Sequence, residues 1–380
     1  MRQPTADELA DRLGRRHVGA VIGTLDLGAD RTVSSAERRR GFQGVVPLAI
    51  EIEGRGKVRR PDGERPGPDT LFEIGSITKT FTSLALAVLV GSGTVSLSTP
   101  LRHLLPTGTA VPSRDGRDIT LEHLARHTSG LPRSPIPMLR ELQIAALRGE
   151  NPYDMDEAAA LDSLSRISLK HTPGRGHGGY SNLGGGLLGI ALRRSAGVDS
   201  YHELIGATVL QPLQLTDTVV RPTTEQAQRL AQGYGLCRRP VEPWYLEGLA
   251  GAGALRSTVT DLLRYLRAQL EPDQTPLADA IRLTHQLWEP RRPMTIGLGW
   301  IRTRSPGGGL WWHNGGTGGF RSFAGFNPKL GRAAVVLVND VRSPDQAGLD
   351  ALQSSSTRRP PAPLRRQPVR PGTEPPGPPA

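Results

Sequence analysis

A serine three residues before a lysine, at the start of an apolar helix, constrains this chain more than any other feature. Ser76 and Lys79 belong to the segment Phe72–Phe81, and the run that follows, 81–90, is mostly Leu, Ala and Val and ends at Gly91. This pattern predicts a buried helix that stops at the glycine. Side chains three residues apart share a helix face, so the hydroxyl and the amine are expected to lie side by side. That is the geometry of a serine nucleophile activated by a neighbouring base.

The composition argues against nucleic acid as a partner. The chain has 380 residues and a net charge of +11, but its 47 basic residues are 43 Arg and 4 Lys spread along the whole sequence. Aromatic residues make up only 4%, and none alternate with basic residues as a base-stacking surface requires. We therefore expect a small-molecule or peptide substrate and no nucleic acid.

Cysteine content and hydropathy further limit the classes of protein to which the chain can belong. The single cysteine, Cys237, excludes a disulfide framework and a cysteine-based zinc site, and we expect no metal and no cofactor. No stretch approaches 18 apolar residues, so no membrane span is expected. Residues 1–16 lack the apolar core of a secretory signal. We expect a cytoplasmic protein as the sequence is written, or a secreted one if the true start lies upstream.

The order of the expected elements predicts an α+β fold. Two runs near the start suit strands, Val18–Leu27 and Val45–Ile52, and the middle of the chain suits helices, at 119–127, 136–170 and 187–196. Four short runs near the end suit antiparallel strands, at 297–301, 310–313, 321–326 and 333–338. We expect an antiparallel sheet built from both chain ends and flanked by helices, with a mostly helical subdomain at about 95–250.

The C-terminal segment differs from the rest of the chain in its amino-acid composition. Residues 360–380 contain nine Pro and no aromatic residue, so this segment cannot bury a core. We expect one domain, residues 1–353, followed by a disordered tail, residues 354–380. The sequence leaves the oligomeric state and the role of the tail open.

Two later motifs supply partners for the serine and the lysine. Tyr180 and Asn182 lie in a glycine-rich stretch, where a phenol could relay a proton and an amide could orient Lys79. His313 ends an expected strand and is followed by glycines; the N–H of Gly316 could pair with that of Ser76 as an oxyanion hole. Apolar surroundings would lower the pKa of the lysine and make it a base.

Each motif alone also has a structural interpretation. Ser76 could be a plain helix cap, Tyr180 a core aromatic residue, Asn182 a turn residue and His313 a surface or structural histidine. The order and context of the three motifs together favour a site. Segments 133–155 and 232–250 are the expected cleft walls. Three aromatic residues could belong either to these walls or to the core: Trp244, Tyr245 and Trp312.

These residues and their surroundings resemble the serine β-lactamase-related family, on the side of class C β-lactamases, D-Ala-D-Ala carboxypeptidases and related esterases. The similarity covers about residues 18–345 and is carried by five segments: Asp69–Ser76, Leu124–Pro132, Pro173–Gly184, Gly251–Thr258 and Trp312–Phe320. The resemblance implies a β-lactamase/transpeptidase-like fold. It also implies a serine hydrolase that forms an acyl-enzyme and then hydrolyses it.

Site roles follow from the resemblance. It implies that Ser76 is the nucleophile, that Lys79 is the base or proton partner, and that Tyr180 is the acid/base. The substrate-binding residues that it implies are Asn182, His313, Gly315, Gly316 and Thr317.

One departure from the family pattern bears on the substrate. His313 stands where β-lactamases and carboxypeptidases carry a lysine, and a histidine near neutral pH supplies only part of a positive charge. This favours a broader hydrolase acting on an amide or ester: a β-lactam, a D-amino-acid peptide or a carboxylic ester. The alternative is a penicillin-binding sensor or interaction module with little turnover.

Overall fold

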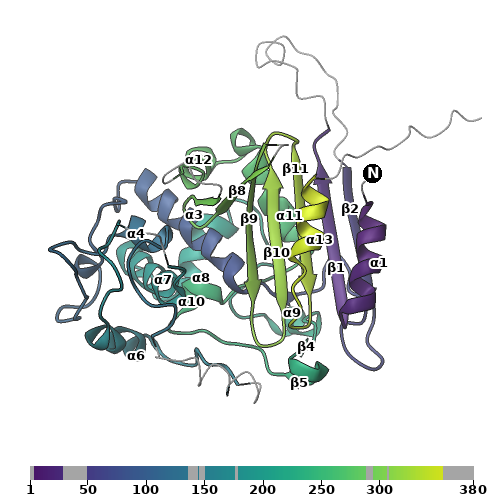
Figure 1. Ribbon diagram of the computed structural model, residues 1–380, viewed down its shortest axis with the longest axis horizontal. Helices are drawn as coiled ribbons and strands as arrows, with labels where there is room; N and C mark the ends of the chain where they lie inside the picture. Colours follow the sequence, from purple (N-terminus) through teal and green to yellow (C-terminus); the bar gives the residue numbers. More distant parts are fainter. Residues whose placement is uncertain are drawn as a thin grey trace, which may run out of the picture.

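A seven-stranded antiparallel sheet forms one side of the molecule (Figure 1). The computed structural model describes residues 4–28, 49–135, 150–175, 179–287, 294–305 and 308–353, together with residue 144, and all counts refer to these. The strands lie in the order β2-β1-β11-β10-β9-β8-β7. Their bounds are β1 Gly19–Asp26, β2 Ala49–Gly56, β7 Met294–Ile296, β8 Ile301–Ser305, β9 Gly308–Gly316, β10 Arg321–Asn327 and β11 Arg332–Val338.

The two ends of the chain meet in this sheet, as the sequence predicts. β1 pairs with β2 on one side and with β11 on the other, with Val21 opposite Leu337. β11 is buried along its whole length, because helices cover both faces of the sheet there. Two short ladders join loops near the sheet: β3 (Phe72–Glu73) with β6 (Arg256–Ser257), and β4 (Gly233–Tyr234) with β5 (Pro240–Val241).

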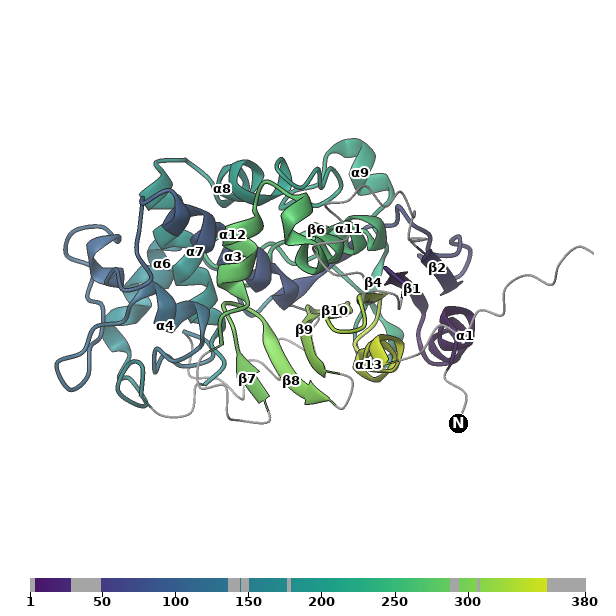
Figure 2. The same cartoon turned by 90° about the horizontal axis from the view of Figure 1, so that it is seen from above.

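Alternating side chains divide the core into two layers. Ile22, Phe323 and Val336 pack under α1 (Ala6–Arg16) and α13 (Asp345–Gln353) on the outer face of the sheet. Their neighbours along the strands join the main core, which α11 (Val259–Leu270) covers on the opposite face. Figure 2 shows α1 and α13 on one side of the sheet and α11 on the other. The predicted α+β architecture is confirmed.

The apolar helix after Ser76 lies at the centre of the helical part. α3 (Thr78–Gly91) is buried from Thr78 to Ala87 and packs against α7, α10 and α12. Its end at the glycine agrees with the prediction. The helices around it are α4 Leu121–Ala125, α6 Glu157–Asp162, α7 Asn182–Ala196, α8 Tyr201–Ile205, α9 Thr224–Gln228, α10 Ala250–Gly253 and α12 Ala278–Thr284.

Several expected boundaries are wrong. In the described part of the expected helical run 136–170, the α-helix covers only Glu157–Asp162 and a 3-10 turn follows at Ser163–Arg166. β2 runs on to Gly56 because it pairs with β1 along its whole length. α7 starts at Asn182, five residues before the expected start at Leu187, because Ser181 caps it and its glycines pack against other elements. Residues 297–300 form the turn between β7 and β8.

Several predictions fall outside the described residues. These are the first part of the second strand (45–48), most of 136–149 and the tail (354–380). The division into one domain and a tail therefore stays a prediction.

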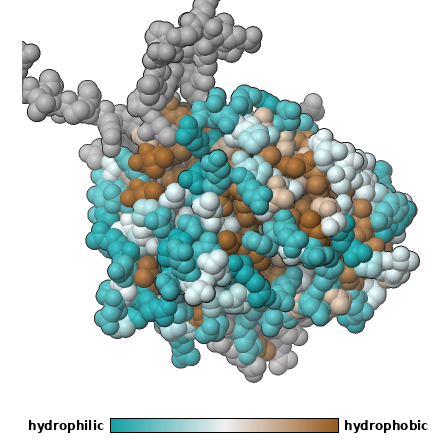
Figure 3. All heavy atoms as spheres, turned by 180° about the vertical axis from the view of Figure 1, so that it is seen from behind, coloured by the Kyte–Doolittle hydropathy of each residue, from teal (hydrophilic) through white to brown (hydrophobic). Residues whose placement is uncertain are grey.

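The described surface mixes hydrophilic residues with small groups of hydrophobic ones, as the face opposite Figure 1 shows (Figure 3). Within the described ranges, no helix has both the length and the apolar character needed to cross a bilayer. The same residues contain no group of three or more His, Cys, Asp or Glu arranged to hold a metal ion.

Candidate active site

Ser76 sits in a 3-10 turn, Gly75–Ile77, that joins β3 to α3. The turn needs glycine at its first position, because Gly75 has a φ of +49° and a Cβ there would lie 2.6 Å from the backbone nitrogen of Gly316. The Ser322 hydroxyl of β10 also donates to the Ile74 carbonyl at 2.8 Å. These contacts hold the serine against the end of β9.

The Lys79 amine has three polar neighbours. Its Nζ donates to Asn182 Oδ1 at 2.9 Å and to the Ala252 carbonyl at 2.6 Å, and it lies 3.1 Å from Ser76 Oγ. A neutral amine has two N–H donors and one lone pair. Once the two carbonyl-type oxygens have taken the donors, the lone pair is left to face the serine hydroxyl.

Burial favours that neutral form. Only 3% of Lys79 is exposed. Desolvation holds the pKa of its amine well below the usual value, and the positive charge of Arg133 lowers the pKa further. Lys79 therefore has the environment that the apolar sequence around it predicts.

Tyr180 packs over the lysine from the loop before α7. The centre of its ring is 4.9 Å from Lys79 Nζ, 5.0 Å from the Arg133 guanidinium carbon and 4.5 Å from the His127 ring. Burial raises the pKa of Tyr180 to about 12, against the opposing effect of its hydrogen bond with Ser76. The phenol is therefore protonated near neutral pH, whereas the lysine beside it is pushed towards its neutral form.

Asn182 is the first residue of α7, and its position follows from local capping. The Ser181 hydroxyl accepts from the Gly184 N–H at 2.9 Å and so fixes the start of the helix. A Cβ on Gly185 would lie 2.9 Å from Lys79 Cε, so glycine lets this helix approach the lysine. The Asn182 amide then donates to the Tyr153 hydroxyl at 2.9 Å and accepts from Lys79.

β9 and the turn after it form the opposite wall. His313, Gly315 and Gly316 are in β9, where Gly315 pairs with Ser322 of β10, and Thr317 follows the strand. The His313 ring lies 6.1 Å from the Tyr180 ring. The structure thus brings all eight site residues expected from the sequence to one place.

His313 differs from the expectation in its charge. The residue is 2% exposed, and its Nδ1 lies 2.6 Å from the carbonyl of Asn314. Burial lowers the pKa of His313 to about 3, against the opposing effect of its contact with the Asn314 carbonyl. The expected partial positive charge near neutral pH is therefore wrong: His313 is neutral there.

A narrow cavity opens beside the serine, and its walls come from the two expected segments. Tyr153, Trp244 and Leu246 line it, opposite Gly316 and Thr317. Of the three aromatic residues that the sequence left open, only Trp244 lines this cavity. Tyr245 lines a different cavity, and Trp312 stacks on Phe323 at the sheet face under α13.

Sequence reasoning missed two contributors to the site. The Ala252 carbonyl holds the lysine from α10, and the ring of His127 supports Tyr180 while its Nδ1 accepts from the Ser181 N–H at 3.3 Å. Burial holds the pKa of His127 well below its usual value, and the charge of Arg133 lowers it further, so this ring is neutral. His127 stands in the Leu124–Pro132 segment, which was the available signal. A backbone carbonyl leaves no signal in a sequence.

A buried ion pair anchors the strand that leads to Ser76. Glu73 and Arg256 pair at 3.1 Å with 3% and 1% of their side chains exposed, and Glu73 also accepts from the Trp244 N–H. Burial raises the pKa of Glu73, while the charge of Arg256 lowers it.

Removing one member of this pair is expected to be strongly destabilising. Glu73→Ala leaves the Arg256 charge buried without its partner and should lower the free energy of unfolding by about 3–5 kcal/mol in chemical denaturation. Asp162→Ala, which removes an exposed pair with Arg166, should lower it by less than about 1 kcal/mol. Equal losses in the two variants would show that burial does not set the effect.

Comparison with known proteins identifies the family of the chain. A family model described as beta-lactamase matches residues 29–357. The D-alanyl-D-alanine-carboxypeptidase/endopeptidase AmpH of Escherichia coli (strain K12) is 31% identical, covering 86% of this chain and 88% of that protein. A beta-lactamase of Pseudomonas fluorescens is 29% identical, covering 70% of this chain and 72% of that protein.

A solved structure shows the same fold. The beta-lactamase/D-alanine carboxypeptidase from Yersinia pestis, complexed with citrate, superposes with a TM-score of 0.72 at 25% identity, covering 91% of this chain and 97% of that chain. The fold and the matched residues define a serine hydrolase of the beta-lactamase type. The chain belongs to the beta-lactamase family.

Proposed function

We propose that the protein hydrolyses an amide or ester through an acyl-enzyme on Ser76. One observation carries this proposal: the buried Lys79 amine directs its two donors to Asn182 and Ala252 and lies 3.1 Å from the serine hydroxyl. A base so placed takes the hydroxyl proton as the serine oxygen attacks the substrate carbonyl carbon.

Opposed pKa shifts support Tyr180 as the acid and Lys79 as the base. Burial lowers the pKa of the Lys79 amine and raises the pKa of Tyr180 to about 12, so the amine accepts a proton and the phenol donates one. In acylation, Lys79 takes the proton of Ser76 and Tyr180 gives one to the leaving group. In deacylation the Tyr180 phenolate takes a proton from the water that attacks the acyl carbonyl, and Lys79 returns its proton to Ser76 Oγ as the bond between Oγ and the acyl carbon breaks.

Backbone amides next to the serine stabilise the oxyanion. Gly75 and Gly316 are in close backbone contact, and Ser76 and Gly316 line the same cavity, which supports their N–H groups as the two donors. Two fixed donors at a developing negative charge lower the barrier by several kcal/mol. Asn182 and Thr317 bind the polar groups of the substrate on either side.

The neutral His313 bears on the substrate class. The relatives carry the names beta-lactamase and carboxypeptidase, whose substrates include a carboxylate. In this chain the wall formed by β9 carries His313 instead, which has no positive charge near neutral pH. We infer that the enzyme accepts esters and amides without a carboxylate as readily as those that carry one.

The pH dependence of this preference tests the state of His313. Because burial lowers the pKa of His313 to about 3, its charge is absent throughout the range from about pH 5 to about pH 8. The ratio of kcat/KM for two p-nitrophenyl esters, one with and one without a distal carboxylate, should stay constant within about twofold over this range. A ratio that rises as the pH falls through 6.5 would show that His313 gains a proton there.

A substrate panel tests the proposed function itself. The wild-type enzyme is incubated with nitrocefin, with a p-nitrophenyl ester and with a D-Ala-D-Ala peptide, and turnover of each is measured. In a parallel experiment, labelling of the enzyme by a fluorescent penicillin is followed. Turnover of at least one substrate is expected. Rapid labelling without turnover would favour a penicillin-binding sensor instead, and well-folded protein that neither labels nor turns over would contradict both.

A further inference from the structure

A second cavity lies behind the wall of the catalytic one and has a volume of about 630 Å³. This volume falls within the range of about 300–1,000 Å³ typical of small-molecule sites. α7, the start of α8 and the segment 245–254 enclose it. The catalytic mechanism uses none of its polar side chains.

The interior of the cavity is apolar and built from small residues. Ile190 on α7 and Ala250 and Ala254 around α10 form its floor, where Gly189 and Gly251 let the two helices pack backbone against backbone. Tyr245, which is 43% exposed, stands at the mouth, and the guanidinium carbon of Arg256 lies 4.6 Å from the centre of its ring. An apolar or aromatic body of about ten heavy atoms fits such a space.

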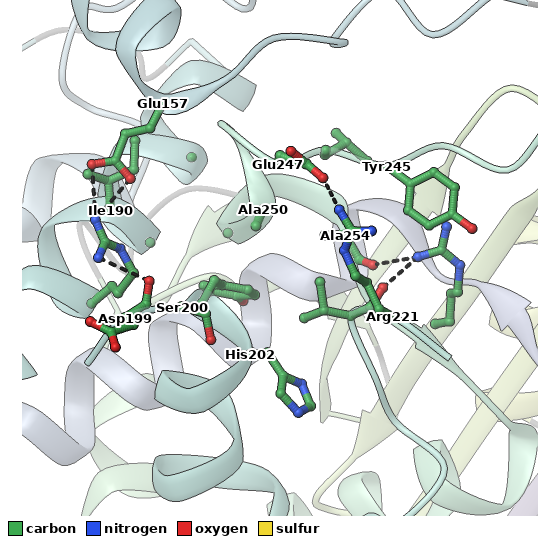
Figure 4. A pocket seen from close by; sticks show the side chains of 18 residues that line it. Glu157, Ile190, Asp199, Ser200, His202, Arg221, Tyr245, Glu247, Ala250 and Ala254 are labelled. Atoms are coloured by element: carbon green, nitrogen blue, oxygen red, sulfur yellow. Dashed lines mark hydrogen bonds and ion pairs between the residues drawn. The ribbon is translucent and has the colours of Figure 1, made fainter. Parts of the chain in front are cut away.

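Charged groups lie on two sides of this floor, as Figure 4 shows. On one side Arg193 donates to both carboxylate oxygens of Glu157 at 3.0 Å. On the other side the exposed Arg221 pairs with Glu247. The third arginine of the lining, Arg256, pairs with Glu73, which lies outside the cavity.

One lining carboxylate is left over. In the described part of the chain, no hydrogen bond or ion pair joins the Asp199 carboxylate to another side chain, whereas each lining arginine has an acidic partner. The exposed Asp199 carboxylate therefore stands at the edge of an apolar floor without an ion-pair partner, although Arg193 donates to the backbone carbonyl of the same residue at 3.3 Å.

We propose that this cavity is a second binding site, for a small molecule with an apolar body and a protonated amine. The apolar body lies on Ile190, Ala250 and Ala254, and the amine pairs with Asp199. An anionic ligand of the same shape is disfavoured, because it would face three carboxylates. The lining arginines that could bind it are already paired with acidic residues.

One side chain, Leu246, and one helix, α10, connect this cavity to the catalytic site. Leu246 lines both cavities. α10 forms the floor of the second cavity through Ala250 and Gly251, and the next residue, Ala252, accepts the hydrogen bond from Lys79. A ligand that shifts α10 or Leu246 therefore changes the environment of the lysine, so occupancy alters the rate at Ser76.

Three probes of one shape test the binding site. 2-Phenylethylamine, 2-phenylethanol and phenylacetate are titrated into the full-length protein, and binding is followed by ligand-observed NMR. The amine should bind at least about threefold more tightly than the other two, which is the effect of one exposed ion pair. Equal or tighter binding of phenylacetate, or no binding of any probe at millimolar concentrations, would overturn the proposal.

Two variants locate the bound amine. Asp199→Asn should remove the preference for the amine and leave the affinity for 2-phenylethanol unchanged, whereas Asp62→Asn, an exposed acid outside the cavity, should change neither. Val220→Trp should fill the cavity and weaken all three probes. Amine binding that survives both Asp199→Asn and Val220→Trp would place the ligand elsewhere and refute the assignment.

The coupling between the second cavity and Ser76 is tested by a separate measurement of the labelling rate. A saturating concentration of 2-phenylethylamine should change the rate of Ser76 labelling by a fluorophosphonate at least about twofold in the wild type. At that concentration Asp199→Asn should respond less, and an unchanged wild-type rate would refute the coupling. Failure of Ser76 to label under any condition would instead count against the proposed function, while the NMR titration still decides whether the cavity binds.

Discussion

Ser76→Ala is expected to lower turnover of every substrate by about 10⁴-fold or more, because the chain then has no oxygen to form the acyl-enzyme. The remaining activity would come from substrate binding and the backbone N–H groups alone. The variant should keep its fold, because the lost hydroxyl neither caps a helix nor packs in the core. Its free energy of unfolding should stay within about 1 kcal/mol of the wild type.

A serine at the far end of the same helix provides the control. Ser92→Ala changes an exposed hydroxyl at the C-cap of α3 and should leave kcat/KM unchanged. Steady-state kinetics on purified, correctly folded proteins compare the two variants. Retention of more than about one tenth of the activity in Ser76→Ala would exclude this serine as the nucleophile.

Lys79→Met is expected to lower turnover by about 10²–10⁴-fold, the usual contribution of a general base. Methionine keeps much of the volume of the side chain but cannot accept the serine proton. Lys170→Met, which changes an exposed lysine, should have no effect on turnover. Activity in Lys79→Met close to the wild type would show that another group, with Tyr180 as the first candidate, takes the proton.

The difference in the free energy of unfolding between the wild type and Lys79→Met also reports the charge state of Lys79. The folded pKa lies well below the value of 10.5 of a free lysine, so the unfolded chain binds one proton more between these two values. The free energy of unfolding therefore rises with pH in this window, and this gain is lost as the pH falls through the folded pKa.

The expected slope can be stated. In the window between the folded pKa of Lys79 and 10.5, the free energy of unfolding of the wild type should rise with pH relative to Lys79→Met, by up to about 1.4 kcal/mol per pH unit. Denaturation curves at several pH values measure the difference. A flat difference would mean that Lys79 is charged in the folded protein, and the assignment of the base would then have to move.

Much of the fold could be predicted from patterns that act locally. The apolar helix after Ser76 and its end at Gly91 follow from periodicity and a glycine stop, and the strands at both chain ends follow from their apolar runs. The start of α7 could not be predicted in this way. Its glycines look like a loop in the sequence, whereas in the structure they let the helix approach Lys79 and Leu249, which lie where side chains would otherwise be.

The site was predictable in its residues but not in its electrostatics. Ser76, Lys79, Tyr180 and Asn182 carry motifs, and the structure brings them together. The neutral state of His313 depends on its burial among side chains distant in sequence, and no motif encodes that burial. The Ala252 carbonyl belongs to the backbone, so any residue at that position could have supplied it.

Mass spectrometry of the enzyme during turnover tests the central claim most directly. The wild type is mixed with a p-nitrophenyl ester, quenched in acid within the first turnovers, digested and mapped. We predict an acyl mass on the peptide that carries Ser76, which disappears as the ester is consumed and is absent from Ser76→Ala. Turnover without this adduct, or an acyl mass on another residue that rises and decays at the rate of catalysis, would contradict the account.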